Sequence, residues 1–237
     1  MSEWKARRFW KLAAIGRTAE GWEVVLDDRP LRTPGKQPLI LPTEALASAI
    51  GAEWDAQADV IDPGAMPLTR AANSAIERVR PNTAAVADML AEYGGTDLLS
   101  YRAEQPEELV QRQAEAWDPL IDWAATGLQA PLRITHGILP VAQDPAVLAR
   151  LRGQLDGLDE FALTALHDLV TLPGSLVIGL AVLHQRIDAD EAFRLSRIDE
   201  TFQAERWGSD EEAEEAAANR RHAMLTAARF RSLSRAG

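Results

Sequence analysis

The chain has 237 residues, 46% of them apolar, which is enough for a sizeable core in one or two domains and argues against extensive disorder. Its 25 Lys+Arg and 36 Asp+Glu give a formal net charge of −11, which disfavours binding to nucleic-acid phosphates and anionic membranes. Cysteine is absent, which excludes disulfides, thiolate metal ligands and a cysteine nucleophile.

Residues 1–41 differ from the rest of the chain in charge and in pattern. They contain 8 Lys+Arg and 5 Asp+Glu, a balance of +3, whereas 42–237 contain 17 and 31, a balance of −14. Alternation over 9–15, β-forming residues at 22–26 and a short apolar run at 38–41 indicate strands, with Gly-, Pro- and Asp-containing turns between them. We predict a small antiparallel meander.

From Pro42 onward the apolar spacing becomes helical. Thr43 and Ser175 are predicted helix caps, and Asp188-x-x-Glu191 and Ser209-x-x-Glu212 have the pattern of capping boxes. Residues 128–141 fit either a short strand or a packed loop. The predicted helices cover 44–57, 68–80, 82–93, 106–126, 144–156, 158–171, 174–185, 189–206 and 210–233, with stops near Pro81, Gly94-Gly95 and Gly127.

These patterns predict an α+β protein. A small N-terminal antiparallel β domain that ends in a helix is expected over 1–61, followed by a larger all-α C-terminal domain over 62–237. The N-terminus lacks the apolar core of a signal peptide, and no stretch reaches ~18 consecutive apolar residues. We therefore expect a soluble, non-exported protein without membrane insertion.

Residue patterns that carry catalysis are missing from the sequence. The four histidines are scattered, no HExxH motif occurs, and His167-Asp168 is an adjacent pair whose side chains point ~100° apart on a helix. Gly174-Ser175 lacks the second glycine of a hydrolase elbow, and no Walker A or GxGxxG fingerprint is present. We predict no catalytic residues, no metal site and no cofactor.

Two segments have features suited to protein contact. Arg29 and Arg32 flank a proline-stiffened turn that can present guanidinium groups to partner carboxylates; the alternative is a hairpin whose arginines pair internally. Residues 199–215 hold eight acids and one base. Some of these acids suit a helix start, but capping needs only one or two, and the surplus suits a basic partner surface.

Ten short motifs stand in the same order as in the ATP-synthase assembly chaperone family, which this sequence resembles over about 8–215, nearly the whole chain. In the N-terminal part they are Arg8-Phe9-Trp10-Lys11, Gly21-Trp22, Leu26 to Pro34, Glu53-Trp54-Asp55-Ala56-Gln57 and Met66-Pro67-Leu68-Thr69-Arg70. Further along they are Thr96-Asp97-Leu98-Leu99, Arg112-Gln113, Trp117-Asp118-Pro119-Leu120, Gly174-Ser175-Leu176 and Gln203-Ala204-Glu205-Arg206-Trp207-Gly208.

The resemblance implies a non-enzymatic chaperone that holds the free α subunit of the F-type ATP synthase catalytic head and shields its β-facing interface until the hexamer forms. It associates function with the acids after Trp-Gly, here Asp210, Glu211 and Glu212, although this sequence continues the acidic run to Glu215. The capping box gives Glu212 a structural task that Glu211 lacks. Together with Trp207, Arg29 and Arg32, these acids are the predicted partner-binding residues.

Two other functions are kept as alternatives: a carboxylate-dependent hydrolase, and a general holdase without a dedicated client. Enzyme turnover would identify the first, and lack of selectivity for one ATP-synthase subunit would identify the second. The expected location is the bacterial cytoplasm, or the mitochondrial matrix for a mature eukaryotic form. The oligomeric state is open, with a monomer favoured, and no nucleic-acid partner is expected.

Overall fold

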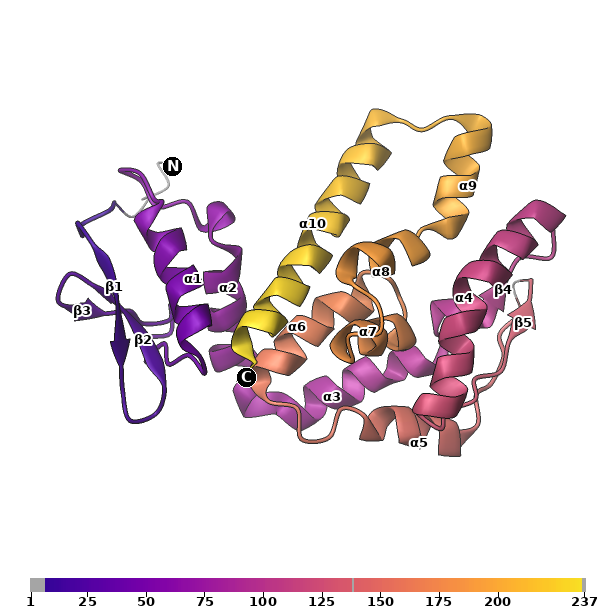
Figure 1. The fold of residues 1–237 in the computed structure, drawn as a ribbon, viewed down its shortest axis with the longest axis horizontal. Coiled ribbons are helices and arrows are strands. Elements are labelled where there is room, and N and C mark those ends of the chain that lie inside the picture. The colour runs from indigo at the N-terminus through magenta and orange to yellow at the C-terminus, as the bar shows by residue number, and fades with distance from the viewer. Residues whose placement is uncertain (1–6, 138, 236–237) are drawn as a thin grey trace. The chain divides into compact units, whose positions relative to one another are not determined.

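The structure is a computed structural model that describes residues 7–137 and 139–235 (Figure 1). Residues 1–6 of the predicted β region, Ile138 and the last two residues lie outside the described residues. The chain divides into two compact units: a sheet unit of Met1–Thr83, Asp159–Ala165 and Arg229–Gly237, and a helical unit of Ala84–Leu158 and Leu166–Ala228. The domain boundary between 61 and 62 stays a prediction.

The sheet unit contains the predicted antiparallel meander. Its strands, in the order β1-β2-β3, are Ala13–Arg17, Trp22–Leu26 and Arg29–Pro30. The third strand is not the expected run 38–41, which makes only isolated bridges such as Trp22 with Leu41. The reason is a tight turn in which Asp27 adopts a φ of 54°, so that Arg29 already pairs with Leu26.

One face of the meander packs on helix α1 (Glu44–Asp55). Val24 and Leu26 alternate along β2 and are buried, as period-two patterning requires, and Leu46 and Ile50 lie one helical turn apart on α1. The Thr43 side chain accepts a hydrogen bond from the Leu46 amide at 3.1 Å, which confirms the predicted cap.

The interruption predicted near Pro81 is present, but as a change of helix type and not as a full stop. Helix α2 (Pro67–Ser74) continues through a π turn (Ala75–Val79) and a 3-10 turn (Arg80–Asn82) into α3 (Thr83–Glu92). Pro81 has no amide hydrogen and therefore interrupts the regular α pattern, but the 3-10 turn carries the chain on.

The helical unit surrounds α7 (Leu176–Leu183), an eight-residue helix that is apolar on every side and therefore belongs in a core. Among the described residues of 128–141, the one strand is β5 (Thr135–His136), which pairs in parallel with β4 (Tyr101–Arg102). The remaining helices are α4 (Glu107–Gly127), α5 (Pro145–Gly153), α6 (Glu160–Thr171), α7 (Leu176–Leu183), α8 (Ala189–Leu195), α9 (Ile198–Trp207) and α10 (Glu211–Ser234), and single 3-10 turns lie at Pro63–Ala65, Tyr93–Gly95 and Leu98–Ser100.

The predicted fold class, a small antiparallel sheet followed by a mostly helical region, is confirmed. One predicted helix, 189–206, is instead two helices, α8 and α9, with a break at Ser196-Arg197. Over residues 7–137 and 139–235, no helix is long and apolar enough to cross a membrane.

Candidate functional site

Most of the motif residues have tasks inside the fold. The Glu53 carboxylate accepts hydrogen bonds from the backbone amides of Leu68 and Thr69 at 2.7 and 2.8 Å, which satisfies the first free amides of α2. Two motifs that lie apart in the sequence are therefore joined by one side chain. The contact between these two motifs has a role in folding and requires no partner protein.

Asp97 joins two further motifs in the core of the helical unit. Its side chain is fully buried and accepts hydrogen bonds from Ser175 Oγ at 2.7 Å, the Val177 amide at 3.0 Å and the Leu99 amide at 3.1 Å. Burial raises the pKa of Asp97 to about 6, although these hydrogen bonds act in the opposite direction. Ser175 in turn accepts from the Ile178 amide, which confirms it as the cap of α7.

The break between α8 and α9 is held by two side chains of α4. The Trp117 indole donates to the Leu195 carbonyl at 2.8 Å, and the Gln113 amide donates to Asp199 Oδ1 at 2.6 Å. In a continuous helix the Leu195 carbonyl would accept from the amide of Asp199 instead. These tertiary bonds explain why the predicted single helix is interrupted.

Phe202 is the point at which α9 is fixed to α4. Phe202 is 2% exposed, and two guanidinium groups lie against its ring, with Arg206 4.6 Å and Arg112 5.3 Å from the ring centroid. Arg206 pairs with Glu108 at 2.7 Å, and Arg112 pairs with Glu205 at 2.6 Å. The hydrogen bonds from Arg206 and Arg112 lower the pKa of Glu108. The end of α9 therefore has a defined position.

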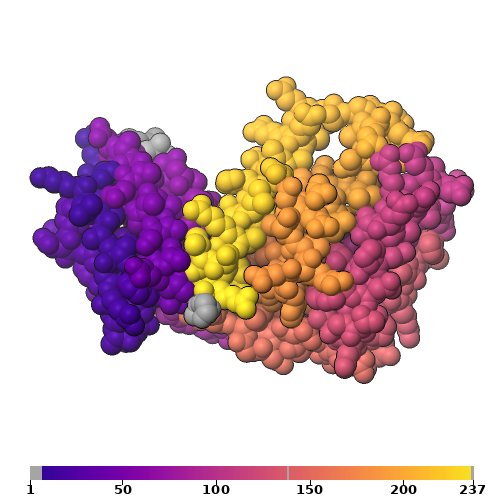
Figure 2. All heavy atoms as spheres, in the orientation of Figure 1, coloured from indigo at the N-terminus to yellow at the C-terminus, as the bar shows by residue number. Residues whose placement is uncertain are grey.

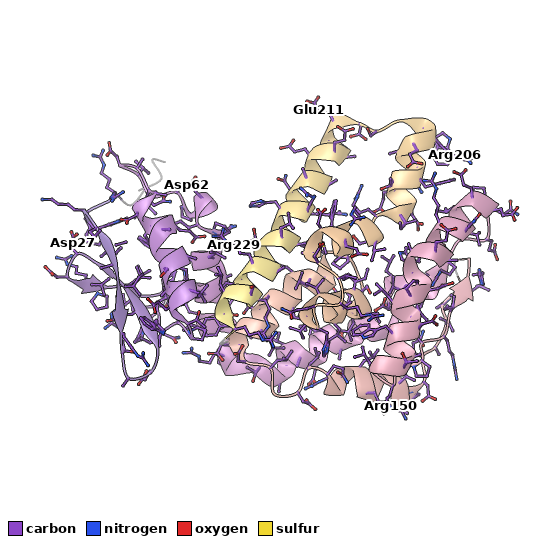
Figure 3. The ribbon with its side chains drawn as sticks, in the orientation of Figure 1. Asp27, Asp62, Arg150, Arg206, Glu211 and Arg229 are labelled. Atoms are coloured by element: carbon purple, nitrogen blue, oxygen red, sulfur yellow. The ribbon has the colours of Figure 1, made fainter. Side chains whose placement is uncertain are left out.

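Trp207 is the large motif side chain of the helical unit that is most exposed. It is the last residue of α9 and is 76% exposed, although a tryptophan normally buries most of its surface. Gly208 follows with a φ of 83°, a conformation that favours glycine, and turns the chain toward α10. Arg206 and Glu211 mark the two sides of this turn in Figure 3.

The start of α10 differs from the predicted capping box. Asp210, not Ser209, is the cap, because its carboxylate accepts from the Ala213 amide at 2.8 Å. The Ser209 hydroxyl donates to the Glu214 carboxylate and does not accept from the Glu212 amide. Glu211 and Glu212 are exposed and have no hydrogen-bond or ion-pair partner in the part of the chain that the structure describes. Asp210 therefore performs the capping task expected of Ser209, and the bond by which Glu212 was expected to reach back is not formed.

We define the acidic turn as Trp207, Asp210, Glu211 and Glu212, the four predicted contact residues that the structure brings together. Arg29 and Arg32 belong to the sheet unit and have local contacts there. Arg29 lies 5.6 Å from the centroid of the Phe9 ring, and Arg32 donates to the Lys36 carbonyl at 3.0 Å. Arg32 therefore fits the alternative in which the hairpin arginines bond internally.

The histidine geometry differs in one respect from the expectation. His167 Nδ1 and Asp168 Oδ1 are 2.9 Å apart, so the adjacent side chains do meet, and this contact raises the pKa of the half-exposed His167. Rotation about the side-chain bonds overcomes the ~100° separation of the two Cβ directions. Among residues 7–137 and 139–235, no group of three or more metal-ligating side chains converges.

Sequence reasoning missed the structural roles of Arg102 and Phe202. The Arg102 guanidinium is nearly buried and lies over the Trp117 ring. Its Nη2 atom is 2.8 Å from Asp118 Oδ1, which makes an ion pair, but the two groups are not aligned for a hydrogen bond. No periodicity identifies such a buried cation. The one sequence signal for Phe202 is its position directly before the motif Gln203 to Gly208, which contains Glu205 and Arg206.

Comparison with known proteins identifies the family. The model of the ATP12 chaperone protein family matches residues 7–125, half of the chain. Together with the relatives below, this match shows that the chain belongs to the ATP12 chaperone family, whose members assist ATP synthase assembly. The resemblance drawn from the ten motifs is thereby confirmed.

Three relatives illustrate the similarity. A crystal structure of Atp12 from Paracoccus denitrificans is 68% identical and has a TM-score of 0.95, with 98% of this chain and 100% of that chain covered. A protein from Agrobacterium tumefaciens described as a chaperone is 38% identical with a TM-score of 0.89, covering 96% and 85%. The mitochondrial protein atp12 of Schizosaccharomyces pombe is 27% identical over 221 residues, 88% of this chain and 76% of its own length.

Proposed function

We propose that this protein binds the unassembled α subunit of the F-type ATP synthase and shields its β-facing interface until the hexamer forms. The observation that carries the proposal is the acidic turn. Trp207 is 76% exposed, and Glu211 and Glu212, close to it in the chain, are exposed carboxylates without a partner among the described residues. An exposed aromatic side chain beside unneutralised acids suits contact with another protein.

The physical task of such a chaperone is occlusion. A subunit that lacks its neighbours exposes a large apolar and charged surface, which promotes self-association. Acidic side chains on a fixed helix end can attract a basic client surface, while Trp207 adds apolar contact area. The contact should be of moderate affinity, because a chaperone that bound like a permanent subunit would not be displaced by β.

No catalytic step is part of this proposal, and it requires neither metal nor cofactor. The carboxylates near the acidic turn are used in helix capping and in ion pairs to arginines, or lie exposed. We propose a cytoplasmic location in a bacterium; the fission-yeast relative is named as mitochondrial. A monomer is the favoured state, and the client complex is proposed to contain one copy.

The experiment that tests the proposal is capture of separately expressed subunits. Tagged protein should retain the free α subunit in soluble form, should not retain the free β subunit, and should release α when β is added. Equal retention of α, β and an unrelated unfolded protein would support a general holdase instead. Turnover of ester or peptide substrates that is lost on carboxylate substitution would support the hydrolase alternative.

A further inference from the structure

Residues 32–36, which we call the basic turn, lie just after β3 in the sheet unit and carry two cations. The Lys36 amide donates a hydrogen bond to the Thr33 carbonyl at 2.8 Å, and the Thr33 amide donates to the Gln37 carbonyl at 3.0 Å. Thr33 is buried, whereas 34–38 are exposed. The basic turn is therefore a closed loop with a buried base and an exposed tip.

Glu77 fixes the tip of the basic turn from a distant part of the sequence. It lies in the π turn Ala75–Val79, and its Oε1 accepts a hydrogen bond from the Gly35 amide at 2.5 Å. Hydrogen bonds from the Thr33 side chain and the Gly35 amide lower the pKa of Glu77. A Cβ atom on Gly35 would lie 2.6 Å from Oε1, so this close approach requires glycine. The carboxylate thus holds the tip in one position.

Lys36 has a backbone conformation that favours glycine. Its φ is 66°, in the left-handed region that residues with a Cβ atom rarely adopt. Hairpin loops of this length commonly place glycine at the left-handed position. Residues held in such sparsely populated regions cluster at binding and active sites. The presence of lysine here therefore indicates a task for its side chain.

The cations around this tip are not neutralised. Arg32, Lys36 and the exposed Arg78 make no ion pair with any residue in the described part of the chain. Arg32 donates to the Lys36 carbonyl at 3.0 Å, which uses one of its five N–H donors and leaves its charge free. Arg78 follows Glu77, and its charge also contributes to the lowered pKa of that carboxyl. Glu23, the acid on the neighbouring strand β2, lies over β1 instead.

This charge pattern indicates what the basic turn can bind. Free guanidinium and ammonium groups attract carboxylates and make charge-assisted hydrogen bonds to them. A nucleic acid or an anionic membrane fits poorly, because three cations are few and the net charge of −11 repels a polyanion. A short acidic segment of a protein needs only local contact with the tip. It is therefore the ligand that this surface fits.

We propose that the basic turn, together with Arg78, binds a short acidic segment of a partner protein, and that Glu77 is the positioning residue of this site. Lys36 and Arg78 contact the carboxylates of the segment, and Arg32 adds positive charge. Glu77 touches no ligand and acts through the turn that it holds. The inference goes beyond the proposed function, since its test does not involve the α subunit.

A peptide titration followed by nuclear magnetic resonance tests the site. The probe is a short serine/alanine peptide with two neighbouring glutamates, added to isotope-labelled protein. The amide signals of Gly35 and Lys36 should shift, and replacing both glutamates of the peptide by glutamines should abolish the shifts. Absence of these shifts would overturn the proposal. Tighter binding of oligothymidylate or of inorganic phosphate than of the peptide would also overturn it, in favour of a nucleic-acid or free-anion site.

K36G separates binding from folding. Glycine fits the left-handed backbone of this position, so the variant should stay folded, but it should bind the acidic peptide about threefold or more weakly. K11A removes another exposed lysine of the sheet unit and serves as the control, with unchanged binding at moderate salt. Equal binding by K36G and wild type, or an equal loss in K11A, would contradict the assignment of the site.

E77A and E77Q test the positioning role, because they change the net charge equally. E77Q keeps an acceptor oxygen for the Gly35 amide, whereas E77A removes it. Cations that were not positioned would bind the acidic peptide more tightly in both variants, since a negative charge is lost. A positioned turn predicts weaker binding in E77A than in wild type and E77Q. Equal or tighter binding in E77A would refute the role of Glu77.

G35A provides a second test in case E77A does not fold. The added Cβ atom displaces the Glu77 carboxylate from the turn without changing any charge. Peptide binding should therefore weaken in G35A, and unchanged binding by the folded variant would refute the positioning role.

Discussion

Asp210 accepts a hydrogen bond from the backbone amide of Ala213 at 2.8 Å, and this bond separates the folding task of the acidic turn from its proposed binding task. Because Asp210 is the cap, D210A should destabilise the start of α10 by about 1 kcal/mol, whereas D210N should restore most of the loss. Amide hydrogen exchange over residues 211–216 measures this directly.

E211A and E212A serve as controls for the cap. Neither side chain has a hydrogen bond to a backbone amide, so both variants should leave exchange over 211–216 within a few tenths of a kcal/mol of wild type. Faster exchange in E212A than in D210A would contradict the assignment and restore the Ser209-x-x-Glu212 capping box.

The Phe202 contact predicts that removing the ring lowers the folding stability much more than removing the charges around it. F202A removes a nearly buried ring that contacts Arg112 and Arg206 and should cost about 3–5 kcal/mol. E108Q and E205Q remove exposed ion pairs that water screens, so each should cost far less stability than F202A. Denaturant unfolding of the three variants measures these values.

A loss of folding stability in E108Q or E205Q as large as that in F202A would show that the ion pairs, not the ring, fix α9 to α4. Client capture adds a second readout. If α9 must be fixed for Trp207 to be presented, F202L should reduce capture more than stability alone requires, under conditions where the variant is fully folded.

Asp97 predicts a pH dependence of stability. Its pKa is raised by burial from 3.8 to about 6 in the folded protein, so between these values the native state holds a proton that the unfolded state has lost. This contribution is fully present below about pH 4 and is lost as pH rises through about 6, a change of about 3 kcal/mol.

The measurement compares wild type with D97N, in which the titrating group is absent. D97N should be less stable throughout, because asparagine replaces one acceptor oxygen by a donor facing backbone amides. The stability difference between the two proteins should shrink by about 3 kcal/mol from pH 4 to pH 7. A difference that is constant with pH would show that the Asp97 pKa is not raised.

Local patterns predicted most of the fold. Thr43 and Ser175 were identified as caps because a hydroxyl before an apolar run satisfies the first amides of a helix, and the structure confirms both. The break at Ser196 was not predictable, because it depends on the Trp117 indole, which is 78 residues away in the sequence from its acceptor Leu195. No local pattern records such a contact.

The candidate site shows the same division. Composition and motif identify Trp207 and the acids as contact residues. Only the structure shows which acid caps the helix and which acids have no partner among the described residues. Asp210 and Ser209 are both good caps by residue type, and the choice between them depends on where Gly208 turns the chain.

The most direct test of the central claim reverses the two free charges. E211K/E212K should weaken capture of the free α subunit by about tenfold or more at low salt, with a smaller loss at moderate salt, because client attraction is replaced by repulsion. The stability cost should stay near 1 kcal/mol per site, the size of a helix-end effect. Glu20 and Asp28 are exposed acids of the sheet unit without described partners, so E20K/D28K changes the net charge equally and serves as the control.

The decisive measurement is therefore α-subunit capture by E211K/E212K and E20K/D28K at two salt concentrations, with thermal melting of both variants alongside. The account predicts a salt-dependent loss of capture in E211K/E212K alone, with both variants folded. Capture by E211K/E212K equal to that of the control, or a collapse of its melting that accounts for the lost capture, would contradict it.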